Sequence, residues 1–255
     1  MRFIVVVILV FLIGAAVFAD SRHSERRLLR ADPDALLADS ALLRFAADRG
    51  RSLFLVHCAS CHGVSGAGDP LNGVPDLTDS DWLYGTGRVA DIEQIIEYGI
   101  RSRNSRAWSL AIMPAYARPH PNPADKNIRP LSPGEIGDLI EFLFRQQGRE
   151  ADAAAASRGA ALYTGDAGCY DCHSADVKGD SAIGAPNLAD RITLYGDGSR
   201  DALYQSIAYG RQGVCPAWIK KLSAAGIRET AVYVYSMSPH PHVERSHPGD
   251  VANAD

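Results

Sequence analysis

CASCH (residues 58–62) and CYDCH (residues 169–173) are the two stretches of sequence that decide the fold. Both have the pattern Cys-x-x-Cys-His, in which two thiols one helical turn apart match the two vinyl groups of one haem. The histidine that follows then faces the iron as an axial ligand. The sequence therefore predicts two covalent haem c groups, with thioether bonds to Cys58, Cys61, Cys169 and Cys172 and iron bonds to His62 and His173.

Other uses of paired cysteines fit this sequence poorly. A thioredoxin-like dithiol requires a surrounding βαβ pattern, which is absent, and does not need a histidine after each pair. A zinc ribbon has its second cysteine pair about 15–20 residues after the first, whereas these two motifs are 111 positions apart. Covalent haem is the interpretation that accounts for both motifs.

The regions that follow the two motifs are copies of each other. Aligned on their histidines, they match without a gap at glycine, proline and aromatic positions, which indicates a tandem duplication. The matched pairs include Gly68 with Gly179, Pro75 with Pro186, Tyr84-Gly85 with Tyr195-Gly196, and Tyr98-Gly99 with Tyr209-Gly210. Each proline lies 13 residues after its histidine. There its carbonyl can accept the histidine Nδ1 proton and orient the ring.

The register shifts before the next match, because the first copy has nine additional residues there. Met113-Pro-Ala-Tyr then corresponds to Cys215-Pro-Ala-Trp. Methionine opposite histidine raises the reduction potential of a haem. We therefore expect Met113 to be the second axial ligand of the first haem, and Cys215 to lie at the corresponding place in the second. Met237 lies beyond this register, at the position of Gln146, and is not expected to bind iron.

Three interpretations of Cys215 remain open on the sequence. It binds the iron as a thiolate, which favours ferric haem and lowers the potential. Alternatively, the iron is five-coordinate or takes another ligand, such as Lys220, Lys221 or a histidine of the C-terminal tail. In the third interpretation, Cys215 is a packed thiol without a role in ligation.

Both copies are expected to be helical, and no segment alternates as a strand would. Residues 132–135 (SPGE) combine an N-cap serine, a proline at the first helical position and a capping-box glutamate. The apolar residues 136, 139, 140 and 143 follow at helical spacing. The expected divisions are a linker at 20–48, haem domains at 49–147 and 158–237, a linker at 148–157 and a disordered tail at 238–255.

Residues 1–19 contain an unbroken apolar run from Phe3 to Ala19. The run is long enough for a membrane anchor, and a cleaved signal peptide is the alternative. Either predicts export, which places the chain on the periplasmic side of the inner membrane, anchored there or soluble after cleavage. The net charge is −4, from 26 basic and 30 acidic residues. This argues against a nucleic-acid partner.

The two halves resemble class I cytochrome c domains, and the pair is similar to the dihaem c subunit of cbb3-type cytochrome c oxidases. The resemblance covers about residues 49 to 237 and rests on the two haem motifs and on the stretches 75–79 (PDLTD), 81–85 (DWLYG), 98–102 (YGIRS) and 113–116 (MPAY). It implies an all-α fold of two tandem domains after the N-terminal segment, with His62 and Met113 on the first haem. It also implies a membrane tether. The family has methionine at the position of Cys215, so that ligand does not carry over.

These observations predict an electron carrier in a respiratory chain rather than an enzyme. Its expected partners are redox proteins, among them a membrane oxidase or a dehydrogenase. The alternatives are a dihaem enzyme that acts on sulfur compounds, as thiosulfate dehydrogenases do, and a haem redox or gas sensor. Thiosulfate dehydrogenases pair a cysteine-ligated first haem with a methionine-ligated second one. The chain order of Met113 and Cys215 is the reverse of that.

Overall fold

The computed structural model describes residues 2–125 and 127–239. Among these residues the chain is helical, and its only β-structure is a set of isolated bridges. The prediction of an all-α fold is confirmed. The elements in chain order are α1 (Arg2–Arg30), η1 (Ala35–Ala38), α2 (Ser40–His57), α3 (Ala59–His62), α4 (Val89–Tyr98), α5 (Pro133–Gln146), α6 (Ala153–Thr164), α7 (Tyr170–His173), α8 (Arg200–Tyr209) and α9 (Ala224–Met237).

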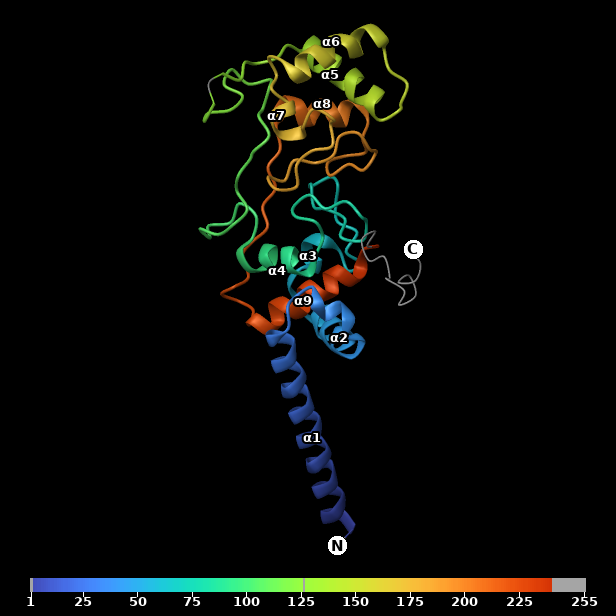
Figure 1. Cartoon of the computed structure of the whole chain (residues 1–255), viewed down its shortest axis with the longest axis vertical. Coiled ribbons are helices and arrows are strands. Elements are labelled where there is room, and N and C mark those ends of the chain that lie inside the picture. The colour runs from blue at the N-terminus through green and yellow to red at the C-terminus, as the bar shows by residue number, and fades with distance from the viewer. Residues whose placement is uncertain (1, 126, 240–255) are drawn as a thin grey trace, which may run out of the picture.

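The molecule is elongated, with α1 projecting from one of two stacked helical units (Figure 1). The first unit contains α2, α3, α4 and α9, and the C-terminal helix α9 packs against α2 and α4. Its core includes Phe54, Val89, Ile92 and Val232. The second unit contains α5 to α8, with α5 packed against α6 and α8. Its core includes Ile136, Leu139 and Tyr163.

The two sequence copies have therefore exchanged their last helices. By sequence, α5 ends the first copy and α9 ends the second, yet α5 packs in the second unit and α9 in the first. Packing therefore crosses the expected division at 49–147 and 158–237 in both directions. Two chain segments cause the exchange: the one after α4 leads to α5, and the one after α8 leads to α9 (Figure 1).

The exchanged helices approach their partners closely at glycines. A Cβ built on Gly50 in α2 would overlap the Glu229 carbonyl of α9, and one built on Gly159 in α6 would overlap the Asp138 carbonyl of α5. Only glycine allows the two backbones to come this near. In both units, a glycine thus allows close packing against a helix from the other sequence copy.

The two crossing segments form backbone hydrogen bonds with each other between the two units. Ile100 and Cys215 exchange two backbone hydrogen bonds, of 2.9 and 3.0 Å. Arg101 then holds both segments, since its Nε donates to the Gly213 carbonyl at 2.6 Å and its Nη1 to the Ala111 carbonyl at 2.9 Å. Arg101 has a φ of 45°, a conformation that is unfavourable for a side chain other than glycine. The hydrogen bonds of Arg101 thus hold the two crossing segments together, and they accompany this unusual backbone conformation.

The C-terminal end of α1 is docked on the first unit. Leu28 is fully buried there. Arg228 of α9, paired with Glu93 of α4, donates to the carbonyls of Leu28 and Ala31 at 3.1 and 3.0 Å. These carbonyls have no partner within the helix, so the buried guanidinium caps α1.

The N-terminal prediction is tested only in part. Over the portion of the chain that the structure describes, no helix is long and apolar enough to cross a membrane. Most side chains of residues 3–19, on which the anchor prediction rests, lie outside that portion. The predicted tail lies outside it as well, apart from residues 238 and 239.

Candidate haem sites

Each Cys-x-x-Cys-His motif forms a single helical turn. In the first, the Cys58 carbonyl accepts from the amides of Cys61 and His62 at 3.1 and 3.0 Å. In the second, the Cys169 carbonyl accepts from Cys172 and His173 at 3.3 and 2.9 Å. All five cysteines are free thiols. The turns thus present the two thiols and the imidazole that covalent haem attachment requires.

The two histidine rings are oriented in the same way. His62 Nδ1 lies 3.4 Å from the Pro75 carbonyl, and His173 Nδ1 lies 3.0 Å from the Pro186 carbonyl. A carbonyl can only accept, so Nδ1 carries the proton and Nε2 has its lone pair free for iron. Burial lowers the pKa of both rings, opposed by these hydrogen bonds. The neutral form, which binds metals, is therefore favoured. The predicted role of the two prolines is confirmed.

Met113 does not lie with the first motif. Its backbone amide donates to the Arg211 carbonyl at 3.2 Å, and it packs against the core of the second unit, which Cys169 also contacts. Tyr116, three residues on, donates its hydroxyl to the Ala167 carbonyl beside the second motif. This packing favours a place in the second unit over the expected pairing of Met113 with His62, because the crossing segment delivers Met113 there.

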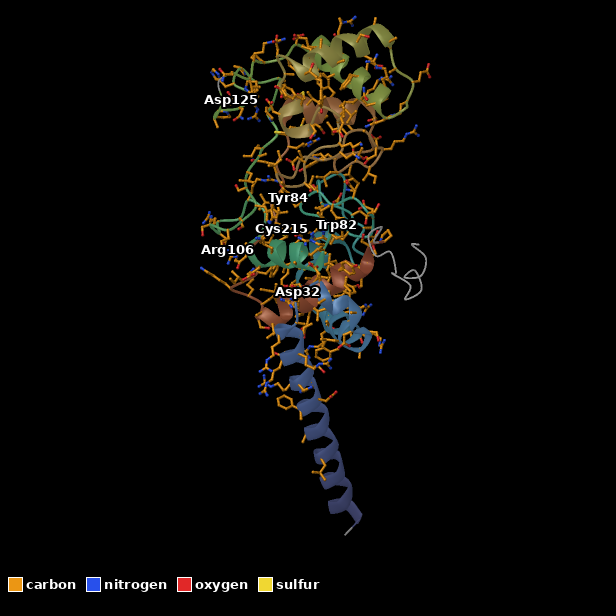
Figure 2. The ribbon with its side chains drawn as sticks, viewed as in Figure 1. Asp32, Trp82, Tyr84, Arg106, Asp125 and Cys215 are labelled. Atoms are coloured by element: carbon orange, nitrogen blue, oxygen red, sulfur yellow. The ribbon has the colours of Figure 1, made fainter. Side chains whose placement is uncertain are left out.

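Cys215 lies with the first motif instead. Burial, together with the nearby Cys58 and Cys61 thiols, raises the pKa of its thiol to about 11. Trp218, in the same loop, packs against the first core together with Cys58. Figure 2 shows Cys215 beside α4, in the first unit. This placement likewise favours the first motif over the expected pairing of Cys215 with His173.

The other ligands considered for Cys215's haem are placed less favourably. Lys220 and Lys221 are exposed, and Lys221 stacks on Trp218 with its Nζ 4.9 Å from the ring centroid. Met237 packs in the first unit, where a Cβ built on Gly66 would lie 3.0 Å from its Sδ. Gly66 accepts from Leu77, near the Pro75 carbonyl that orients His62, so Met237 borders the His62 loop. The tail histidines lie outside the described residues.

The role of Arg101 is not evident from the sequence. Arg101, Arg103 and Arg106 form a basic strip that suits a solvated loop, with haem propionates or an acidic partner as alternatives, whereas Arg101 holds both crossing segments. The sequence signal for this role is the change of register after Gly99, where the first copy has additional residues. An insertion there lets the two copies follow different paths, and Arg101 lies at its start.

The residues present fit haem. Two free thiols and an oriented imidazole occur at each motif. The described residues also include one buried side-chain polar atom that has no partner, the hydroxyl of Tyr84 between the two units. Such an atom indicates a group that the polypeptide itself does not supply.

Comparison with known proteins agrees with this chemistry. Residues 47–146 match the family model described as cytochrome c, and residues 154–234 match the model of cbb3-type cytochrome c oxidase subunit III. A cbb3-type cytochrome c oxidase subunit CcoP from Cereibacter sphaeroides is 34% identical, covering 86% of this chain and 71% of its own length. CcoP from Azospirillum brasilense is 37% identical, covering 86% and 72%.

The chain belongs to the CcoP family. A third relative, CcoP from Rhodobacter capsulatus, is 35% identical and covers 87% of this chain and 73% of its own length. As a member of this family the chain has two cytochrome c domains and carries two covalent haem c groups. The family places it among the subunits of respiratory oxidases.

Proposed function

We propose that this chain carries single electrons through its two haems, as a subunit tethered by residues 3–19 to the periplasmic side of the inner membrane. Its partner is a membrane oxidase, which the names of its relatives support. The observation that carries the proposal is the pair of oriented attachment motifs, joined in one molecule by the two crossing segments. Bound haem supplies one-electron iron chemistry, and the polypeptide supplies position and ligands.

The axial ligands we propose follow the crossing. The first haem would be held by Cys58, Cys61, His62 and Cys215. The second would be held by Cys169, Cys172, His173 and Met113. Support comes from the packing of Met113 and Cys169 against the same core and from the nearness of Cys215 to Cys58 and Cys61.

Different ligands give the two haems different potentials. Cys215 loses its thiol proton when it binds iron, and the thiolate charge stabilises the ferric state. The thioether of Met113 carries no charge and raises the potential. The first haem is therefore the low-potential site, and electrons move downhill from the first unit to the second.

The test is EPR and potentiometry of Cys215→Met beside the wild type. We expect the lower potential to rise by about 0.1 V or more, within the range that axial ligands span, and its low-spin signal to change. Met237→Leu is the matched control, with both potentials unchanged. Identical spectra for wild type and Cys215→Met would show that Cys215 does not bind iron.

The crossing itself is tested in a chain that carries only the first haem. Replacing Cys169 and Cys172 by alanine removes the second attachment site. In that background, Cys215→Met still changes the spectrum of the remaining haem, while Met113→Leu leaves it unchanged. The opposite result would restore the pairing of Met113 with His62.

The crossed ligands also bear on the sulfur-enzyme alternative, because they place cysteine on the first haem, as in thiosulfate dehydrogenases. The relatives named above are oxidase subunits, which favours the carrier. Assays of the loaded protein with thiosulfate and with peroxide separate the two. A carrier is reduced and oxidised once per haem without sustained turnover.

A further inference from the structure

Tyr84 has a buried hydroxyl with no hydrogen-bond partner in the described part of the chain. The residue is 5% exposed. Its ring meets the edge of Trp108 at a centroid distance of 5.6 Å, and the Arg101 guanidinium carbon lies 5.9 Å from its centroid. Figure 2 labels Tyr84 above Cys215, where the first unit meets the second. The hydroxyl is therefore buried without an acceptor among the described residues, and a guanidinium lies over the face of its ring.

The Tyr84 side chain reaches from the first sequence copy into the second haem loop. A Cβ built on Gly184 would lie 2.6 Å from the Tyr84 hydroxyl oxygen. Gly184 lies between His173 and Pro186, the residues that form the proximal side of the second site. Nearby, the Gly85 amide donates to the Ser181 carbonyl at 3.1 Å, which fixes the register of this contact.

Tyr195 makes the reciprocal contact and serves as an internal comparison. Its ring lies against Gly73, in the loop between His62 and Pro75, and Gly196 donates to the Pro70 carbonyl at 2.9 Å. Tyr195, however, is only half-buried, with the Arg211 guanidinium 4.3 Å from its ring centroid. The duplication thus produced two crossing tyrosines, of which Tyr84 alone has a buried hydroxyl without a partner in the described residues.

A buried hydroxyl needs a hydrogen-bond acceptor, and an ionised acceptor makes the stronger bond, the more so where a guanidinium lies near the same ring. Each haem brings two propionate carboxylates into the fold. Resting on the proposed function above, we propose that the Tyr84 hydroxyl donates a hydrogen bond to a propionate of the second haem, so that the first copy tunes the potential of a haem attached to the second. Arg101 adds positive charge at the same place. Tyr84 is a positioning residue for that carboxylate.

The test compares Tyr84→Phe with Tyr195→Phe in the full chain loaded with both haems. Without its donor, the propionate charge stabilises ferric iron more strongly. At a fixed ambient potential, the ferric-to-ferrous ratio of the Met113-ligated haem should rise about two- to tenfold in Tyr84→Phe, the range that one hydrogen bond supports. The resonance Raman propionate bending band of that haem should shift as well. Tyr195→Phe should leave both readouts of that haem unchanged.

A chain with p-aminophenylalanine in place of Tyr84 keeps a donor of the same shape and should restore the wild-type ratio and band. An unchanged ratio and band in Tyr84→Phe would overturn the inference, as would a shift confined to the first haem. If Tyr84→Phe fails to load haem, the chain with p-aminophenylalanine provides the test instead. A propionate band in that chain that differs from the wild-type band would contradict the proposal. Failure of the proposed function is a separate result, seen as a wild-type protein that does not bind two haems.

Discussion

At the scale of single residues, the two glycines that end α4 and α8 control the approach of the crossing segments. Gly99 has φ +79° and Gly210 has φ +71°. A Cβ on Gly99 would overlap the Cys215 carbonyl and lie 2.8 Å from the Ala217 amide. One on Gly210 would lie 2.5 Å from the Met113 carbonyl. Each glycine therefore touches the segment that carries the proposed ligand from the other sequence copy.

Gly99→Ala and Gly210→Ala should accordingly disturb different haems. Each should cost about 1–2 kcal/mol for the left-handed backbone alone, with the backbone contact adding to it. Under the crossed assignment, Gly99→Ala alters the EPR signal of the thiolate-ligated haem. Gly210→Ala weakens the near-infrared band that a methionine–iron bond gives. Gly137→Ala, where a Cβ meets nothing within 4 Å, is the control and should be neutral or stabilising. The same response to both variants would argue against separate sites.

Asp81 gives the molecule a predictable dependence on pH. Burial, together with the charges of Asp190 and Asp79, raises the pKa of its carboxyl to about 6. In the unfolded chain the pKa is about 3.9. The folded state therefore prefers the protonated form, and this contribution to stability is complete below about pH 4 and lost as pH rises through about 6.

Asp81→Asn should remove this dependence. Thermal unfolding of the variant and the wild type should agree near pH 4, while at pH 7 the variant should be more stable by about 1–2 kcal/mol after allowance for solvent screening. Asp48→Asn, on the exposed face of α2, should follow the wild type at both pH values. A variant that loses stability at pH 7 would show that the Asp81 carboxylate is stabilised when charged.

At the scale of helices, local signals were dependable. The capping box predicted at 132–135 is present: the Ser132 hydroxyl accepts from the Glu135 amide, and the Glu135 carboxylate accepts from the Ser132 amide at 2.8 Å. The short helix α4 ends at a glycine, Gly99, which is its C-cap. Such signals depend only on residues within one turn of each other, so sequence suffices to find them.

Ser132→Ala should reduce the free energy of unfolding by about 1 kcal/mol, because the N-terminal amides of α5 lose their acceptor. Ser157→Ala is the matched control. Its hydroxyl donates to the Ala153 carbonyl within α6, a bond that helices do not need, and stability should change by less than about 0.5 kcal/mol. Chemical denaturation of both variants measures the difference. Equal losses would mean that the capping box contributes nothing specific.

At the scale of the whole molecule, the exchange of α5 and α9 determines which pieces of the chain can fold. Residues 110–212 contain α5 to α8 and the Met113 segment, so all helices of the second unit are present. Residues 31–147 contain the first haem motif but lack α9, whose side chains fill the first core.

We therefore expect fragment 110–212 to fold with one haem, while fragment 31–147 stays unfolded by circular dichroism. Adding a peptide of residues 211–239 should restore structure to the latter, because it supplies α9 and Cys215. A fragment 31–147 that folds alone, with Met113 bound to its haem, would contradict the exchanged architecture.

The sequence by itself determined the chemistry of this protein: covalent haem at two motifs, the histidines, the orienting prolines and the helical fold. All of these depend on residues within a short distance along the chain or on matches between the copies. Only the tertiary structure decided which copy supplies the last helix of each unit. Both copies have the same pattern, so local sequence does not say which partner helix α5 or α9 packs on. The choice depends on contacts between distant residues, such as Ile100 with Cys215 and Gly50 with Glu229.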